Sequence, residues 1–192
     1  MTRAAAARHR PGHAAGPPAT ARKGGTMDLL YVAEATATGD GREGAVRSSD
    51  GALDATLVAP PALGGAGGVG TNPEQLFAAG YAACFHAALL WIARQDRIAV
   101  TGSSVTARVG LGEGGEGLRL DVELLVDLPG LDGRQAGELV ARAHRTCPYS
   151  AATRGDADVR VRLADGTVPG GLSPGGVAPD GTSPAGRTGA AG

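Results

Sequence analysis

The chain has 192 residues, of which 33 are glycine and 12 are proline, and its formal net charge is −1. This near-neutral balance lacks the concentrated basic surface that binds phosphate backbones, which argues against nucleic acid as a partner. The 2 cysteines are too few for a disulfide-dense secreted scaffold and fit a reactive pair in a reducing, cytoplasmic setting.

The two ends of the chain differ in composition from its middle. Residues 1–26 carry no acidic residue and lack the continuous apolar core of a signal peptide, so we predict a disordered extension before Met27. Residues 165–192 hold few large apolar groups that could offset the entropy of ordering, which predicts a disordered tail. One folded domain is therefore expected over residues 27–164.

Three short strands are expected at the start of this domain. Apolar residues recur at alternate positions from Leu30 and lead into an Ala/Thr run that ends at Thr38. A short strand is expected over 45–48 and a weaker one over 53–58. Asp50-Gly51, which lies between these two, has the composition of a tight turn.

The next segment, from Thr71 to Arg94, predicts a helix. Asn72 suits the N-cap, Pro73 suits the first helical position, and Gln75 completes a spacing like that of a capping box. Apolar residues lie all around this helix rather than on one stripe, so nearly every side of it should be covered. Because a few short strands of one chain cannot supply such cover, we predict an obligate, intertwined homodimer.

Two other interpretations of this region are weaker. The charge-free run over 75–93 approaches the roughly 20 residues of a membrane span, but its alanines, Gly80 and His86 favour a buried helix, and no membrane partner is expected. The preceding segment 65–70 fits the pattern G-x-G-x-x-G of dinucleotide-binding loops. A proline pair separates it from the nearest strand, and no acidic residue follows at the usual distance, so we favour a flexible loop and expect no bound cofactor.

A hairpin, a helix and a last strand complete the domain. Apolar residues alternate over 105–124 around a Gly-rich turn, which predicts an antiparallel hairpin with one buried face. Asp132 marks the start of a helix whose apolar stripe ends at Cys147, where Pro148 discourages further turns. Alternation over 159–163 predicts a final strand. The order βββ-α-ββ-α-β predicts an α+β fold of antiparallel sheets wrapped around central helices.

The two cysteines are the candidates for chemistry. Cys84 lies in the middle of the apolar helix, where a shielded thiol has a raised pKa and is inert unless a positive group stabilises its thiolate. Taken alone, Cys84 is more typical of a small core residue. Two cysteines permit a single intramolecular pairing, and the distinctive context of Cys147 favours a reactive pair. His86 and His144 have no companions at metal-ligand spacing, so no metal site is expected.

Three strings of the sequence point to one family. They are ATATGDGREGAVRSSDG, LGGAGGVGTNPEQLFAAGYAACF and CPYSAATRGDADV, which begin at residues 35, 63 and 147. Together they closely resemble the organic hydroperoxide resistance proteins, a branch of the osmotically inducible protein C superfamily. The resemblance spans Met27 to about Leu163, which is essentially the whole of the expected domain, and it leaves out both ends.

The resemblance implies a thiol peroxidase domain over residues 27–164. Cys84 matches the peroxidatic cysteine and Cys147 matches the resolving cysteine, so a disulfide between them is implied. Arg42 matches the family's catalytic arginine, and Glu74 matches the glutamate that holds it. The family is an intertwined dimer with its active sites at the subunit interface, in agreement with the dimer predicted from the apolar helix.

These residue types suit the implied chemistry. A guanidinium lowers the pKa of a shielded thiol and stabilises the alkoxide that leaves a cleaved O–O bond. A carboxylate orients that guanidinium through a planar contact of two hydrogen bonds. The loop Gly39–Gly41 before Arg42 is one residue longer than the family's usual form, so it bears on where Arg42 points.

The resemblance also implies a dihydrolipoyl group on a lipoylated protein as the reductant. An apolar pocket should favour alkyl or fatty-acid hydroperoxides over hydrogen peroxide, and its candidate residues are Leu76, Phe77, Phe85 and Tyr149. Two alternatives stay open. One is a peroxidase with a single working cysteine or another reductant, and the other is a redox-sensing or small-molecule binding module that uses the same cysteine pair without turnover.

Overall fold

The computed structural model of the protein describes residues 28–114, 117–155, 157–170 and 172. By its internal contacts the chain divides into two units, Met1–Glu34 and Ala35–Gly192. The expected extension over 1–26 and most of the expected tail lie outside the described residues. All of the helices and strands described below belong to the second unit.

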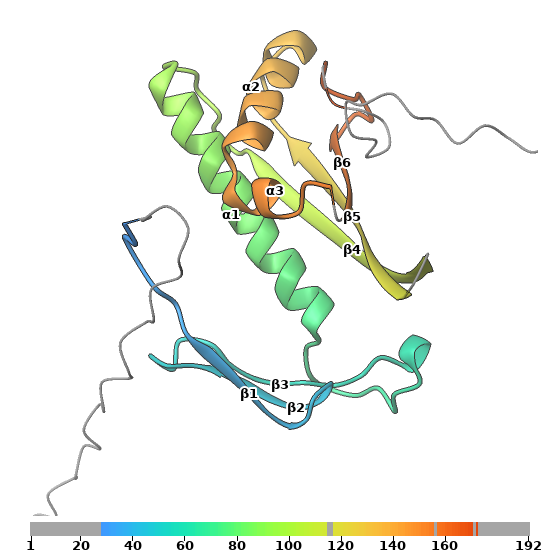
Figure 1. The fold of residues 1–192 in the computed structure, drawn as a ribbon. Coiled ribbons are helices and arrows are strands. Elements are labelled where there is room, and N and C mark those ends of the chain that lie inside the picture. Colours follow the sequence, from blue (N-terminus) through green and yellow to red (C-terminus); the bar gives the residue numbers. More distant parts are fainter. Residues whose placement is uncertain (1–27, 115–116, 156, 171, 173–192) are drawn as a thin grey trace, which may run out of the picture. The chain divides into compact units, whose positions relative to one another are not determined.

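The second unit is an α+β structure with two small sheets and three α-helices among its described residues (Figure 1). Its order confirms the predicted βββ-α-ββ-α-β, with one further short helix before the last strand. The elements are β1 (Ala35–Asp40), β2 (Glu43–Ser48), β3 (Asp54–Thr56), a 3₁₀ turn (Pro61–Leu63), α1 (Pro73–Gln95), β4 (Ser104–Gly114), β5 (Gly117–Asp127), α2 (Gly133–Thr146), α3 (Pro148–Ala152) and β6 (Asp158–Leu163).

The first sheet is antiparallel, in the order β1-β2-β3. β1 begins at Ala35 rather than at Leu30, and Leu30 is fully exposed. The reason lies in the pairing, since Ala35 is opposite Ser48, the last residue of β2, and Ser48 then bonds to Leu53 across the turn. Every residue of β1 is exposed, so this sheet has little apolar cover within one chain.

The second sheet has the order β4-β5-β6 and corrects one expectation. β4 and β5 form the predicted antiparallel hairpin, but β6 pairs parallel to β5, with Val122 opposite Val159. Helices α2 and α3 lie between β5 and β6 in the sequence. A helical connection of this kind lets the chain return beside β5 in a parallel direction. The sheets are therefore not wholly antiparallel.

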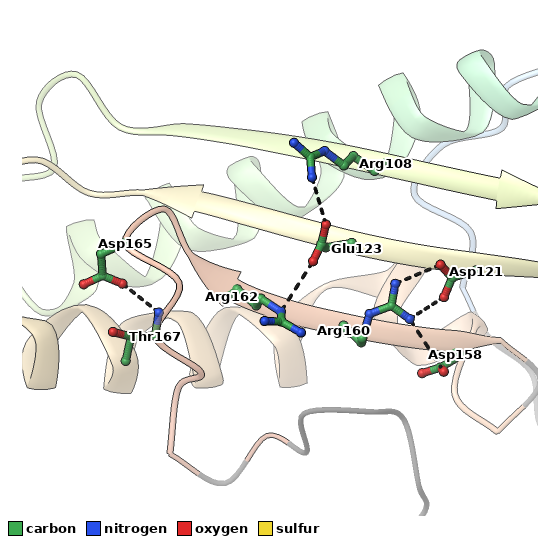
Figure 2. A network of polar contacts seen from close by, with 8 residues as sticks. All are labelled: Arg108, Asp121, Glu123, Asp158, Arg160, Arg162, Asp165 and Thr167. Atoms are coloured by element: carbon green, nitrogen blue, oxygen red, sulfur yellow. Dashed lines mark hydrogen bonds and ion pairs between the residues drawn. The ribbon is translucent and has the colours of Figure 1, made fainter.

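The two faces of the second sheet differ in polarity. Val122, Leu124 and Val126 of β5 are fully buried in the core that the sheet shares with α1 and α2. The opposite face carries a network of ion pairs (Figure 2) in which Glu123 contacts two arginines and Arg160 contacts two aspartates. One apolar face and one charged face confirm the predicted hairpin pattern.

Helix α1 begins as the sequence predicts. The side chain of Asn72 accepts a hydrogen bond from the Gln75 N–H at 2.9 Å, and Pro73 is the first helical residue. One side of the helix is buried, but a stripe at four-residue spacing is exposed in the single chain. The stripe consists of Ala79, Ala83, Ala87 and Trp91. Helix α1 is long and apolar enough to cross a membrane, but the core helix of a soluble protein has the same length and composition.

The C-terminal part of the domain departs from expectation in two places. Asp132 caps α2 as predicted, but Pro148, expected to stop the chain's helical turns, opens the new helix α3, because proline suits a first helical position. Beyond β6, Pro169 is buried against Gly137, and the Leu163 N–H donates to the Thr167 carbonyl oxygen. The packed part of the chain therefore runs past the expected boundary at residue 164.

Candidate active site

The fold brings the two cysteines together although they are 63 positions apart in the sequence. Cys84 lies in the middle of α1 and is half-buried, whereas Cys147 is fully buried at the junction between α2 and α3. Both are free thiols, and their Sγ atoms are 3.4 Å apart. A disulfide bond is about 2.05 Å long, so a small shift of either side chain would join them.

Three influences act on the pKa of the Cys84 thiol, and they do not all have the same direction. Burial raises its pKa, and the neighbouring Cys147 raises it further, whereas a hydrogen bond from the Tyr149 backbone N–H lowers it. Burial is the largest of these influences, so the pKa of Cys84 in the single chain lies above its ordinary value. The thiolate needs a further positive charge before it can be a strong nucleophile near neutral pH.

Arg42 and Glu74 form a two-bonded ion pair. Arg42 lies in the turn between β1 and β2, and its Nη1 and Nη2 donate to Glu74 Oε2 and Oε1 at 2.8 and 2.7 Å. The pair raises the pKa of Arg42 and lowers the pKa of Glu74, chiefly through these hydrogen bonds. The loop Gly39–Gly41 therefore leaves Arg42 in contact with Glu74.

The ion pair and the sulphur pair occupy different parts of α1. Glu74 is in the first turn of the helix, and Cys84 follows it by ten residues, which at about 1.5 Å per residue is about 15 Å along the axis. Arg42 is accordingly not among the groups that shift the pKa of Cys84. Within one chain, the expected contact between the guanidinium and the thiol is not made.

Three aromatic rings pack against one another on α1, which carries Cys84, and on α3, which follows Cys147. The rings of Phe77, Tyr81 and Tyr149 lie with their centroids 5.8 to 6.3 Å apart. Of the four predicted pocket residues, Phe77 and Leu76 are half-buried and Tyr149 is 41% exposed. Phe85 has no exposed surface, so in this conformation it belongs to the core and cannot contact a bound substrate.

A separate open cavity of about 380 Å³ lies at the start of α1. None of the four predicted pocket residues lines it. Glu74 is the one charged group in its lining, which is otherwise mostly apolar. The lining residues are Pro60, Ala62, Leu63, Asn72, Glu74, Gln75, Ala78, Ala107, Val109 and Leu111.

Sequence reasoning missed a buried set of hydroxyl groups beside the cysteines. The hydroxyl of Tyr81 donates to Ser150 Oγ at 3.0 Å and lies 3.3 Å from Thr153 Oγ1. The available signal was Tyr81 itself, because a tyrosine inside an apolar helix needs a partner for its hydroxyl. The motif CPYS already held that partner, Ser150.

The described residues hold no cluster of three or more His, Cys, Asp or Glu side chains that could bind a metal ion. His86 Nε2 lies 3.1 Å from Ser103 Oγ. His144 is half-buried next to Phe85, and burial lowers its pKa. Neither histidine belongs to a group of metal-ligating side chains among the described residues.

Comparison with known proteins gives consistent matches. The family of OsmC-like proteins matches the chain over residues 64–162. The organic hydroperoxide resistance protein of Xanthomonas axonopodis pv. citri is 55% identical over 137 residues, covering 71% of this chain and 96% of the relative. The organic hydroperoxide resistance protein OhrB of Bacillus subtilis is 47% identical over 136 residues, covering 70% and 98%.

Solved structures match over the same part of the chain. The crystal structure of OhrB from Bacillus subtilis has a TM-score of 0.65 at 47% identity and covers 70% of this chain and 99% of its own. An organic hydroperoxide resistance protein from Legionella pneumophila has a TM-score of 0.68 at 46% identity, with coverage of 71% and 99%.

Proposed function

The chain belongs to the OsmC-like family, and within it to the organic hydroperoxide resistance proteins of the oxidative stress response. From this premise we propose that it is a thiol-dependent peroxidase that reduces organic hydroperoxides to alcohols. The observation that carries the proposal is the 3.4 Å distance between the sulphur atoms of Cys84 and Cys147. Two thiols at this distance can complete a cycle of oxidation and disulfide formation without a bound cofactor.

In the first step the Cys84 thiolate attacks the terminal oxygen of the hydroperoxide. The O–O bond breaks, the sulphur is oxidised to sulfenic acid, and the alkoxide leaves and takes up a proton to become the alcohol. In the second step the Cys147 thiol attacks the sulfenic sulphur, so that a disulfide forms and water is released. Because the second sulphur is already near, this step competes with further oxidation of Cys84.

The disulfide must then be reopened by an external dithiol. We propose a dihydrolipoyl group on a lipoylated protein, which is oxidised to the cyclic lipoyl disulfide while both cysteines return to thiols. Cys147 is fully buried and Cys84 is half-buried, so a dithiol reaches the Cys84 side first. Because access to the disulfide is limited to the Cys84 side, a narrow dithiol on a flexible arm suits it better than a dithiol on a bulky protein surface.

A second copy of the chain supplies what one copy lacks. The Arg42–Glu74 pair lies about 15 Å along α1 from Cys84, too far for a guanidinium to stabilise the thiolate. The exposed apolar stripe of α1, which ends at the 54% exposed Trp91, is a surface that a second copy would cover. We therefore propose a homodimer in which the ion pair of each copy faces the Cys84 of the other.

The substrate is proposed to be an alkyl or fatty-acid hydroperoxide. Apolar surface is available on α1, which carries Cys84, and on α3, which directly follows Cys147. It is offered by the half-buried Leu76 and Phe77 and the partly exposed Tyr149. Such surface would bind an alkyl chain and would add nothing to the binding of hydrogen peroxide. We also propose a cytoplasmic location, which subcellular fractionation tests.

The decisive experiment is steady-state consumption of cumene hydroperoxide by the purified protein. Dihydrolipoamide and reduced thioredoxin are compared as electron donors, and hydrogen peroxide serves as the alternative substrate. We expect many turnovers per site with dihydrolipoamide and cumene hydroperoxide. Consumption that stops at one equivalent per site with every dithiol would favour the redox-sensing module instead.

A further inference from the structure

A largely buried cluster of hydroxyl groups lies one helical turn from Cys84. Tyr81 has no exposed surface, and its hydroxyl donates to Ser150 Oγ at 3.0 Å and lies 3.3 Å from Thr153 Oγ1. Ser150 is also buried, with 1% of its surface exposed. Because a buried hydroxyl that loses its partner is costly, these groups keep one another in place.

The cluster ties two helices together. Tyr81 lies on α1, Ser150 lies on α3, and Thr153 caps the end of α3 while its hydroxyl donates to the Tyr149 carbonyl oxygen at 2.9 Å. The helices approach closely here, since a Cβ atom on Gly80 would lie 3.3 Å from the ring of Tyr149. The three hydroxyls therefore link α3 and its C-cap to α1 at this point.

Helix α3 in turn places two groups at Cys84. The backbone N–H of Tyr149, in the first turn of α3, donates a hydrogen bond to the Cys84 sulphur. Cys147, which directly precedes α3, holds its own sulphur 3.4 Å away. A displacement of α3 away from α1 would weaken the first contact and lengthen the distance between the two sulphur atoms.

We propose that Tyr81 is a positioning residue for the thiol chemistry: its hydroxyl bonds hold α3 so that the α3 amide stays on Cys84 and the second sulphur stays within reach. An N–H that donates to a thiolate favours the charged form. The role of Tyr81 in turnover rests on the proposed function, whereas its effect on Cys84 can be measured without any peroxide.

The other groups around Cys84 do not take over this task. Among the described residues, Cys147 is the titratable group that acts on the pKa of Cys84, and it raises that pKa. Burial raises the pKa of Tyr81, which keeps its hydroxyl protonated as a donor. On α2, burial and two nearby arginines lower the pKa of His144, so its ring is neutral and offers no positive charge at neutral pH.

The test measures the pKa of Cys84 from the pH dependence of its alkylation by iodoacetamide. All variants carry Cys147→Ser, so that one thiol titrates. Tyr81→Phe and Ser150→Ala remove the two ends of the buried hydrogen bond, and Ser150→Thr keeps a hydroxyl there. Tyr31→Phe is the matched control, because it removes the same hydroxyl from a tyrosine that is 80% exposed.

We expect Tyr81→Phe and Ser150→Ala each to raise the pKa of Cys84 by about one pH unit, the size of one hydrogen bond to a charged group. Ser150→Thr and Tyr31→Phe should keep the parental value. A folded Tyr81→Phe protein with the parental pKa overturns the proposal. If Tyr81→Phe does not fold, the contrast between Ser150→Ala and Ser150→Thr decides, and equal values for these two overturn it.

A second measurement uses proteins that retain Cys147. After excess cumene hydroperoxide, Tyr81→Phe should accumulate several times more over-oxidised Cys84 than Tyr31→Phe, as seen in intact-mass spectra, because the second sulphur is less often in place. Equal over-oxidation would overturn the part of the proposal that concerns Cys147. A shifted pKa in a protein whose parent turns over no peroxide would leave the positioning role in place and reject the proposed function.

Discussion

At Cys84, burial and hydrogen bonding act on one thiol in opposite directions, and burial prevails in the single chain. In the proposed mechanism the Cys84 thiolate is the nucleophile, so the rate of peroxide reduction should rise with pH through the Cys84 pKa and level off above it. Arg42→Ala should move this inflection up by roughly one to three pH units, because an opposite charge near a thiol lowers its pKa by that amount. Stopped-flow measurement of hydroperoxide consumption across pH gives both curves.

The matched control for this prediction is Arg47→Ala. Arg47 lies on the same sheet as Arg42 and pairs with Asp54, but its side chain is 68% exposed and belongs to neither the sulphur pair nor the ion pair with Glu74. The pH profile of Arg47→Ala should match that of the parent. An inflection that Arg42→Ala leaves in place would mean that its guanidinium does not approach Cys84 in the assembled protein.

Cys147→Ser tests the second sulphur. The variant should reduce one equivalent of hydroperoxide and then stop, because the sulfenic acid on Cys84 no longer has a thiol at 3.4 Å to condense with. With excess oxidant, intact-mass spectra should show Cys84 carrying two or three additional oxygen atoms. Cys84→Ser should remain unmodified and inactive under the same conditions, and an unmodified Cys147→Ser protein would contradict the assigned roles.

The sequence motifs identify the candidate site residues, but they do not predict how those residues are arranged in space. The sequence names Cys84, Cys147, Arg42 and Glu74, and the chain does bring them together in two pairs. The motifs do not show that the Arg42–Glu74 pair lies away from the pair of sulphur atoms. The ten-residue spacing of Glu74 and Cys84 implies this separation only when both residues are placed on one helix. The contact between Tyr81 and Ser150 joins residues 69 positions apart, a relation that only the packed structure reveals.

For helix α1, we expect the N-cap to affect both the stability of the protein and the position of Glu74. Asn72→Ala removes the acceptor for the Gln75 N–H and should lower the free energy of unfolding by about 1 kcal/mol. Because Glu74 lies in the uncapped turn, hydroperoxide reduction should fall as well. Urea denaturation and steady-state rates measure the two effects.

Asp132→Ala provides the comparison, since Asp132 caps α2 through the same kind of bond to the Gln135 N–H at 2.8 Å. Its loss of stability should be similar, but its rate should stay near that of the parent, because the cap lies at the far end of α2 from Cys147. Equal losses of rate in both variants would show that the cap at Asn72 acts through stability alone.

Element boundaries were predictable where a local signal marks them. Caps at Asn72 and Asp132 and the alternation over 105–124 depend on near neighbours in the sequence, and the structure confirms them. The parallel direction of β6 and the start of β1 at Ala35 depend on which strand is the partner, and no local pattern carries that information. Helix α3 was missed because Pro148 suits both an ending and a beginning.

For the whole molecule, the exposed stripe of α1 tests the homodimer. Trp91→Glu places a charge on this stripe, and a buried unpaired charge costs about 3–5 kcal/mol, enough to weaken association by a factor of at least about a hundred. Light scattering should find monomers, and hydroperoxide reduction should fall with them. Thr106→Glu, on the exposed side of β4, should leave both unchanged.

The prediction of a second copy comes from the sequence, because α1 is apolar on more sides than one short chain is expected to cover. Its consequence for the site was not visible, since the sequence does not show that the Arg42–Glu74 pair lies away from Cys84. A dimeric Trp91→Glu protein with parental activity would contradict both the interface and the shared site.

The long span between the two cysteines also affects thermal behaviour. A bond between Cys84 and Cys147 would tie together positions 63 residues apart and restrict the unfolded ensemble, which is worth about 4 kcal/mol by loop-closure entropy. Scanning calorimetry should therefore show the oxidised protein melting roughly 10 °C above the reduced one, with no such rise in Cys147→Ser. In a mixed sample, the fraction of protein that melts at the higher temperature would then measure the fraction that holds the Cys84–Cys147 disulfide.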